Sequence, residues 1–169
     1  MKNIALFIDI DNMREIKLDT KLLIEKIKEY FREECKICIG KAFYEMKGDA
    51  YSTFKYNLYK SGVEPIYSPN FGNVNDENRI GKSVSDSIMI CSALETLYKN
   101  SNIDTYVIVS SDKDFVPLIK NINAEGKEVL VIGLKLNTSD YLIEVCNSIG
   151  IKFFDYEIFT SENKEDILK

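Results

Sequence analysis

The stretch VIVSSDKDFVPLI, residues 107–119, runs from an apolar strand directly into two aspartates and then into a helix. Two carboxylates two residues apart at the end of a buried strand repel each other and lose solvation, so their placement needs a physical reason. The same pattern occurs in IALFIDIDNM, residues 4–13, where a strand leads into Asp9 and Asp11. We expect a divalent cation between these strand ends, because it would offset the repulsion.

Strands and helices alternate along the chain. Apolar runs predict strands, and apolar residues at helical spacing predict the helices between them. The expected strands are 4–8, 36–46, 63–68, 105–110, 128–133 and an edge strand at 151–156. The expected helices are 18–34, 49–62, 82–100, 114–124 and 139–146. This order predicts an α/β three-layer sandwich, in which helices cover both faces of a mostly parallel central sheet.

The length and composition are those of one folded domain. The chain has 169 residues, of which 45% are hydrophobic and 29% charged, as in ordinary globular proteins. We expect the domain to span 1–155 and a charged C-terminal tail to span 156–169. No run approaches the roughly 20 apolar residues of a membrane span, and the start of the chain lacks a signal-peptide pattern. The expected protein is cytoplasmic, with no membrane contact.

The absence of histidine limits the catalytic mechanisms and metal sites that the chain can support. With no histidine in the chain, Ser-His-Asp and Cys-His hydrolysis and histidine-ligated zinc are excluded. Catalysis would rest on carboxylates, lysines, hydroxyls or a metal. The net charge of −5 argues against nucleic-acid binding by bulk attraction alone. This charge does not exclude a phosphodiester substrate if cations neutralise the acidic groups.

Four of the carboxylates are expected to meet. In parallel α/β sheets, ligands bind outside the carboxyl ends of the strands, where the strand order reverses. Asp9, Asp11, Asp112 and Asp114 all follow such ends. If strands 4–8 and 105–110 are neighbours, these side chains converge in one crevice.

Some of these residues, and the neighbouring Asn12, also have a structural explanation. Asp11 and Asn12 fit a turn or a helix cap. Asp114 fits the N-cap of the helix that follows it, which leaves Asp112 without such a role. Asp9 directly follows apolar strand residues and has no basic residue nearby in the sequence.

Further polar residues surround this predicted crevice. Lys82 and Asp86 are four apart, so they share one helix face, where an exposed ion pair is the alternative to a functional role. Ser110 and Ser111 are placed to hydrogen-bond the carboxylates or a bound phosphate. Hard carboxylate oxygens suit Mg²⁺ or Mn²⁺, which bridge phosphate oxygens and lower the pKa of a bound water.

Three stretches in this order resemble the NYN-domain family of PIN-like proteins, particularly its bacterial LabA-like branch. They are LFIDIDNM (6–13), GKSVSDSIMICSALETLY (81–98) and TYVIVSSDKDFVPLIKNINAEGKEVLVIG (105–133). The resemblance covers roughly residues 3 to 155 and implies a PIN-like (Rossmann-like) fold with metal-dependent cleavage of RNA. By this resemblance, the metal-binding and catalytic residues would be Asp9, Asp86, Asp112 and Asp114, supported by Asn12.

Two positions depart from the family pattern. Ser111 stands where the family has a glycine, which adds a side chain where the substrate backbone would approach. Ser92 stands where many members have a further aspartate, six residues after the one matching Asp86. The loss of an acid would weaken metal binding or leave a module that only binds.

The first hypothesis is therefore a ribonuclease hydrolase that uses Mg²⁺ or Mn²⁺ and acts on single-stranded RNA. The expected supporting residues are Asn12, Asp11, Ser110, Ser111 and Lys82. The candidate substrate contacts are Lys41, Lys47, Lys82, Arg79 and Lys113, with Tyr44 and Phe71 for stacking on unpaired bases.

Two other hypotheses stay open. DIDNM also resembles the Asp-x-Asp motif of haloacid-dehalogenase-type phosphatases, although their later acids are more widely spaced and a cap insertion is absent here. A non-catalytic PIN-like module that binds RNA or a protein is the third reading. PIN-like domains often form homodimers, and the segment from Tyr51 to Tyr59 is either such an interface or a core face.

Overall fold

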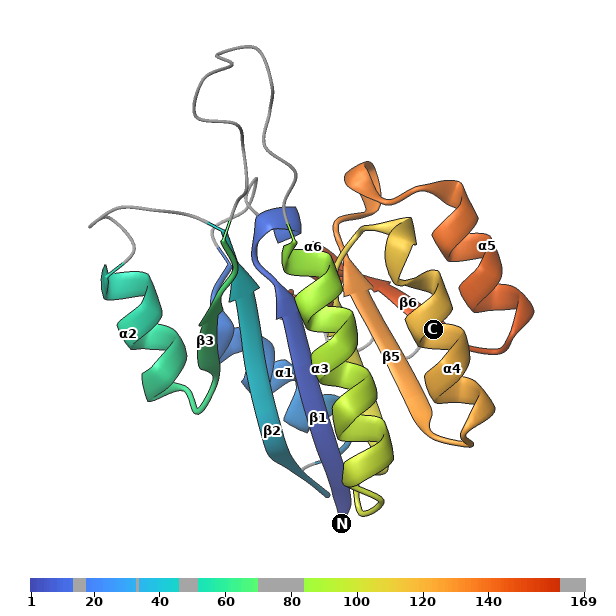
Figure 1. Cartoon of the computed structure of the whole chain (residues 1–169), viewed down its shortest axis with the longest axis horizontal. Coiled ribbons are helices and arrows are strands. Elements are labelled where there is room, and N and C mark those ends of the chain that lie inside the picture. Colours follow the sequence, from blue (N-terminus) through green and yellow to red (C-terminus); the bar gives the residue numbers. More distant parts are fainter. Residues whose placement is uncertain (14–17, 33, 46–51, 70–83, 162–169) are drawn as a thin grey trace.

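A computed structural model describes residues 1–13, 18–32, 34–45, 52–69 and 84–161 of the chain. In this part, the strands form one parallel sheet in the order β3-β2-β1-β4-β5-β6 (Figure 1). Their bounds are β1 Lys2–Asp9, β2 Cys35–Tyr44, β3 Glu64–Tyr67, β4 Thr105–Val109, β5 Glu128–Gly133 and β6 Lys152–Asp155. The predicted parallel α/β sandwich is confirmed, and 151–156 does contain an edge strand.

Helices cover both faces of this sheet. Their bounds are α1 Thr20–Tyr30, α2 Ser52–Lys60, α3 Ser85–Lys99, α4 Val116–Ala124, α5 Asp140–Ser148 and α6 Tyr156–Thr160. Short 3₁₀ turns are η1 Asp11–Met13, η3 Lys113–Phe115 and η4 Lys135–Asn137. The helices α1, α2 and α6 bury apolar side chains on one face, and α3, α4 and α5 on the other. None of the described helices is long and apolar enough to cross a membrane.

The central strands are apolar over residues 4–8 and 106–109 because both of their faces are covered there. In β1, Leu6 and Ile8 belong to the core under α1, whereas Phe7 belongs to the core under α3. The Phe7 ring lies between the rings of Phe43 and Tyr106, with centroids 6.4 and 6.3 Å away. This continuous burial explains why the strands read as unbroken apolar runs in the sequence.

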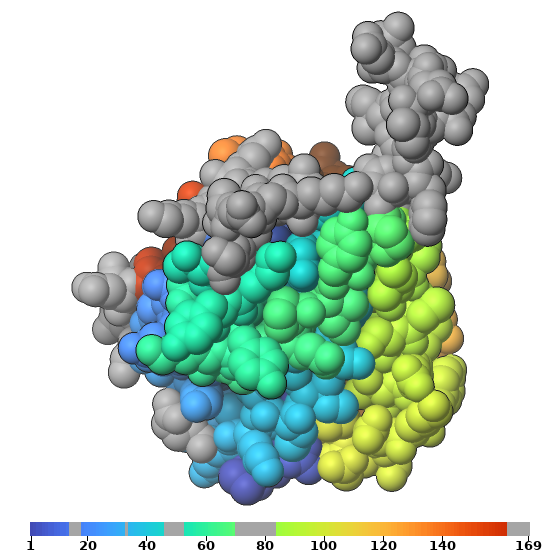
Figure 2. Space-filling model, turned by 60° about the vertical axis from the view of Figure 1, so that its left-hand side comes forward, coloured from blue at the N-terminus to red at the C-terminus, as the bar shows by residue number. Residues whose placement is uncertain are grey.

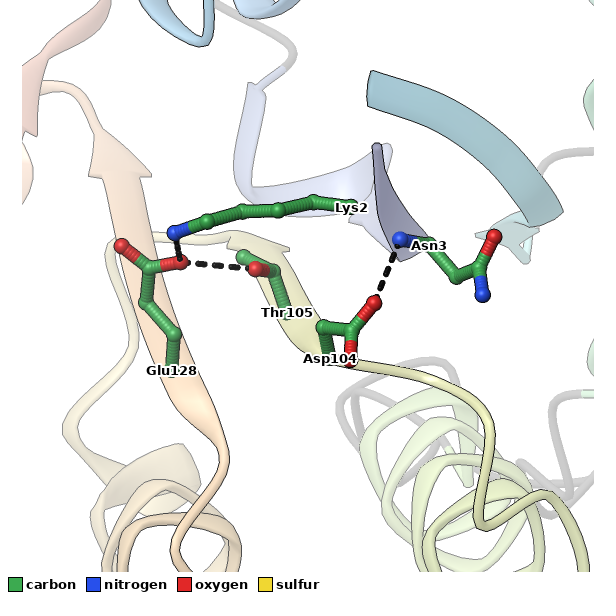
Figure 3. A network of polar contacts seen from close by, with 5 residues as sticks. All are labelled: Lys2, Asn3, Asp104, Thr105 and Glu128. Atoms are coloured by element: carbon green, nitrogen blue, oxygen red, sulfur yellow. Dashed lines mark hydrogen bonds and ion pairs between the residues drawn. The ribbon is translucent and has the colours of Figure 1, made fainter. Parts of the chain in front are cut away.

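The amino ends of three strands are joined by polar contacts (Figure 3). Lys2 Nζ lies 2.6 Å from Glu128 Oε2, and Thr105 Oγ1 donates to the same oxygen at 2.7 Å. The Asn3 amide N–H donates to Asp104 Oδ2 at 2.7 Å. These contacts link β1, β4 and β5 and so support the register of these strands. A shift of one strand by one residue would move each of its side chains to the other face of the sheet.

One segment differs from its expected role, and a second was left open between two roles. Part of the expected charged tail is the helix α6, in which Tyr156 and Phe159 are buried against the core; residues 162–169 lie outside the described residues. In α2, Leu58 is buried, whereas Tyr56 and Tyr59 are exposed. The apolar content of α2 therefore serves the core through Leu58, and its tyrosines face outward.

Candidate functional site

The carboxyl ends of β1 and β4 are adjacent. Ile8 is paired with Val109, so the residues that follow the two strands leave the sheet side by side. The chain continues from β1 towards β2 on one side and from β4 towards β5 on the other. The strand order reverses at this junction, which is where parallel α/β sheets bind ligands. The expectation that these two strands are neighbours is confirmed.

Asp9 lies at this junction and is almost fully buried, with 1% of its surface exposed. Its Oδ1 accepts the Asn12 amide N–H at 3.3 Å, and its Oδ2 accepts both Asn12 Nδ2 and Ser110 Oγ, the latter at 3.0 Å. Burial raises the pKa of Asp9, and the hydrogen bonds from Asn12 and Ser110 oppose that rise. Since a carboxylate has about four acceptor sites, Oδ1 retains one acceptor site that the described hydrogen bonds do not use.

Ser110 connects Asp9 to the segment after β4. Its hydroxyl donates to Asp9 and accepts the Asp112 amide N–H at 3.1 Å. The Asp112 side chain then accepts the Asp114 amide N–H at 2.8 Å through Oδ1 and caps η3. The expectation that Asp114 is the cap was wrong, because a 3₁₀ turn precedes α4 and moves the capping position to Asp112. Asp114 itself is exposed.

Asp86 comes to the same region from the first turn of α3. Its side chain is half-buried, and α3 contacts both β1 and η3. Burial, followed by the charges of Asp9, Asp112, Asp114 and Asp11, raises its pKa from 3.8 to about 6. The negative charges of the other four acids therefore act on the Asp86 carboxyl group. Lys82, its predicted partner, lies outside the described residues.

In the part of the chain that the structure describes, the four predicted ligands have no cationic partner. Within the described ranges, no ion pair joins Asp9, Asp86, Asp112 or Asp114 to a lysine or arginine. Their donors are all carboxylate oxygens, a chemistry that fits Mg²⁺ or Mn²⁺. Among the described side chains, however, no three His, Cys, Asp or Glu residues are grouped closely enough to hold a metal ion. Mg²⁺ sites commonly use one or two carboxylates and complete the shell with waters and substrate phosphates.

Asp11 has a separate position. Its Oδ2 accepts the Glu45 amide N–H at 2.9 Å, just beyond the end of β2, and the Ile10 amide N–H donates to Phe43 O at 3.0 Å. These contacts fix the turn after β1 to the neighbouring strand. The acidic region thereby extends from β4 across β1 to β2.

Ser111 points away from these carboxylates. It is 3% exposed, and its Oγ accepts the Leu134 amide N–H at 2.8 Å. Gly133 allows this close approach, because a Cβ there would lie 2.9 Å from Ser110 O and 3.0 Å from Ser111 Oγ. The Ser111 hydroxyl is therefore engaged with the backbone after β5, and whether its side chain also meets a substrate stays a prediction. Its hydroxyl joins the end of β4 to the end of β5.

The predicted substrate contacts are dispersed. Lys41 Nζ donates to Ser92 Oγ at 2.9 Å, and Lys41 lines a hollow of about 480 Å³ that none of the clustered aspartates lines. Lys113 is exposed in η3 beside Asp112, and Tyr44 is buried at 8% exposure. Of the predicted contacts, Lys47, Phe71, Arg79 and Lys82 lie outside the described residues.

Comparison with known proteins identifies relatives. The model of the NYN domain family matches residues 3–151. The uncharacterized protein MJ0482 of Methanocaldococcus jannaschii is 32% identical over 98% of this chain, which spans 63% of that protein's length. A crystal structure of VPA0982 from Vibrio parahaemolyticus, a protein of unknown function, has a TM-score of 0.69 at 22% identity, and the match covers 92% of this chain and 93% of that one. At this identity the similarity to VPA0982 concerns the fold alone.

Proposed function

The chain belongs to the NYN domain family, and from this premise we propose that it is a metal-dependent ribonuclease that hydrolyses RNA phosphodiester bonds. One observation carries the proposal. The buried Asp9 and the half-buried Asp86 and Asp112 face a common region at the strand-order reversal, without a cationic partner in the described chain. Unpaired carboxylates in such a place are costly unless a cation completes the site.

The chain's residues have distinct roles in this proposal. Asp9, Asp86, Asp112 and Asp114 hold Mg²⁺ or Mn²⁺ directly or through water. When bound, such an ion neutralises the acids, polarises the phosphoryl group and lowers the pKa of a water. Asn12 and the serine hydroxyl at the end of β4 orient Asp9, because both donate hydrogen bonds to its Oδ2. Their donation also favours the ionised carboxylate that a metal ion requires.

A second candidate is a module that binds RNA or a protein without cutting. Among the described residues, no three acids are grouped closely enough to hold a metal ion, which favours this candidate. Metal dependence separates the two candidates. Cleavage needs the ion, whereas simple binding on the same surface does not.

The test is cleavage of labelled single-stranded RNA in Mn²⁺, in Mg²⁺ and in EDTA. The key variant is Asp112→Asn, which keeps the size and cap acceptor of the side chain but removes its charge. Asp104→Asn is the matched control, because Asp104 is an exposed acid at the amino end of β4 that also accepts a backbone N–H. We expect metal-dependent cleavage by the wild type and Asp104→Asn, and none by Asp112→Asn.

Two other results would count against the nuclease. Intact RNA under every condition, from folded protein that binds Mn²⁺, would contradict RNA hydrolysis. RNA binding that needs no metal and survives Asp112→Asn would instead support the non-catalytic module.

A further inference from the structure

An exposed tyrosine lies at the same edge of the sheet as the aspartates. Tyr67 is the last residue of β3 and is 43% exposed. Its ring contacts that of Tyr44, with the centroids 5.8 Å apart and the planes 57° apart. Tyr44 is buried at 8% exposure. One aromatic ring is therefore held in the structure, and it supports a second ring that remains accessible to solvent.

Backbone pairing fixes Tyr67 relative to the acidic region. Asp9 is paired with Phe43, and Phe43 with Ile66, so Tyr67 lies one residue beyond the level of Asp9. Two strand spacings separate β1 from β3, which corresponds to about 10 Å. The Ser68 amide N–H also donates to Tyr44 O at 2.8 Å and extends the pairing past Tyr67. The ring thus stands on a strand end at this edge of the sheet. Tyr44 packs in the core under α1, whereas Phe43, at the level of Asp9, packs in the core under α3, so a bound strand that reaches both Tyr67 and Asp9 crosses this edge.

A cation lies beside this pair of rings. Lys55 Nζ, from α2, is 5.4 Å from the centroid of the Tyr44 ring. Figure 2 shows α2 and β3 side by side on one face of the molecule. In a protein with a net charge of −5, a local ammonium group next to an aromatic surface offers an attachment point for a phosphate.

The other exposed tyrosines differ from Tyr67. They lie on helices, and in the described chain none of them contacts another aromatic ring. They are Tyr56, Tyr59, Tyr98 and Tyr141. Aromatic residues are common in strands for packing reasons alone. The feature specific to Tyr67 is the combination of an exposed ring, a supporting ring, a nearby cation and a place at the carboxyl edge.

We infer that Tyr67 stacks on an unpaired base of single-stranded RNA whose backbone lies at Asp9, Asp86 and Asp112. In this arrangement Lys55 attracts an adjacent phosphate. The inference rests on the proposed function for the location of the scissile bond. Stacking on a protein ring requires a base that is free of its neighbours, which single strands offer and an intact duplex does not. The expected substrate class is therefore single-stranded or unpaired RNA.

The test compares four variants. Tyr67→Ala removes the ring, Tyr67→Leu keeps an apolar contact with Tyr44 without a π-face, and Tyr67→Phe keeps the ring. Tyr98→Ala is the control, since Tyr98 is 64% exposed on the last turn of α3 and contacts none of the described aromatic rings. Binding is measured in EDTA with short single-stranded RNA that contains 2-aminopurine, whose fluorescence is quenched by stacking. Cleavage is measured separately in Mn²⁺, and circular dichroism checks the fold.

We expect Tyr67→Ala and Tyr67→Leu to bind about tenfold more weakly and to lose part of the quenching, whereas Tyr67→Phe and Tyr98→Ala match the wild type. Weakened binding with intact wild-type cleavage supports both proposals. If the wild type cleaves RNA but Tyr67→Leu binds and quenches like Tyr98→Ala, the stacking role is wrong and the nuclease stands. If the wild type binds through Tyr67 but never cleaves, the stacking role stands and the nuclease is wrong. Equal binding of a duplex and a single strand would also overturn the inference.

Discussion

The hydroxyl of Ser110 donates a hydrogen bond to Asp9 Oδ2 over 3.0 Å, although the two residues are 101 positions apart in the sequence. The contact crosses the junction of β1 and β4, where the strand order reverses. The Ser110 hydroxyl oxygen also accepts the Asp112 amide N–H. One side chain therefore holds both ends of the acidic region in place.

Replacing Ser110 with alanine should disturb stability and the site together. Asp9 loses a charge-assisted hydrogen bond and the Asp112 amide N–H loses its acceptor, so we expect the free energy of unfolding to fall by about 2 kcal/mol. Ser110 is also the hydrogen-bond partner of the proposed metal ligand Asp9. Because such partners orient the ligands they bond to, the affinity for Mn²⁺ should fall about tenfold. Urea unfolding and Mn²⁺ titration measure the two effects. Ser148→Ala is the control, because Ser148 Oγ donates to the local Val145 O on the exposed end of α5. Equal effects of both variants would contradict the proposed role of Ser110.

Because the pKa of Asp86 is raised, we expect the stability of the metal-free protein to depend on pH. Burial and the neighbouring acids raise its pKa from 3.8 to about 6, so the folded state holds this proton more tightly than the unfolded chain. The stability that protonation provides is present below pH 3.8 and is lost as the pH rises through about 6. At pH 7.5 we expect Asp86→Asn to be more stable than the wild type by about 1–2 kcal/mol, after allowance for partial exposure.

Thermal or urea unfolding of both proteins between pH 3.5 and pH 7.5 measures this difference. The two curves should meet at the acidic end, where the wild-type carboxyl is protonated. Saturating Mn²⁺ should reverse the order at pH 7.5, because a ligand that binds the folded state stabilises only the protein that retains its site. A wild type that is more stable than Asp86→Asn in EDTA at pH 7.5 would contradict the raised pKa.

Restoring the family's glycine at Ser111 should destabilise the protein without improving it as a nuclease. Ser111→Gly leaves the buried Leu134 amide N–H without its 2.8 Å partner, at a cost of about 1–3 kcal/mol. Ser111→Ala separates this loss from the added backbone freedom of glycine. We expect both variants to cleave RNA at the wild-type rate below their melting temperatures. Faster cleavage by Ser111→Gly would show that the hydroxyl obstructs the substrate.

Restoring the family's acid at Ser92 should leave metal binding unchanged. The Ser92 hydroxyl accepts a hydrogen bond from Lys41 Nζ at 2.9 Å. Ser92 also follows Asp86 by six residues, which corresponds to about 9 Å along a helix. Ser92→Asp should therefore pair with Lys41 and add less than about 1 kcal/mol of stability. Calorimetric Mn²⁺ titration of Ser92→Asp, with Ser92→Asn as the uncharged control, tests this. Tighter Mn²⁺ binding by the aspartate variant alone would place position 92 in the metal site.

The sheet and its acidic edge were predictable from local patterns. A strand buried on both faces must be apolar along its length, so β1 and β4 could be recognised as uninterrupted runs. Asp9 and Asp112 stand out because they end such runs. The alternation of strands and helices then restricted the topology to parallel, right-handed connections, which brings those ends to one edge.

Other features depend on contacts that no local pattern specifies. Whether Asp112 or Asp114 caps the turn depends on the 3₁₀ geometry between β4 and α4. The direction of the Ser111 side chain depends on its neighbour β5, where Gly133 leaves space for it. Lys41 lies at the level of Phe7, two residues before Asp9, so it meets Ser92 further along α3 rather than the acids at the strand ends.

The sequence by itself determined the α/β class, the alternating elements and the acids at the strand ends, because these follow from apolar periodicity and from the residue types that end each run. Only the tertiary structure decided which partners those acids have. The pairing of β1 with β4 joins Ser110 to Asp9, and the pairing of β2 with β3 sets Tyr67 against Tyr44 at the same edge. Such contacts arise from the order and register of strands distant in sequence, which hydrophobic patterns alone leave unspecified.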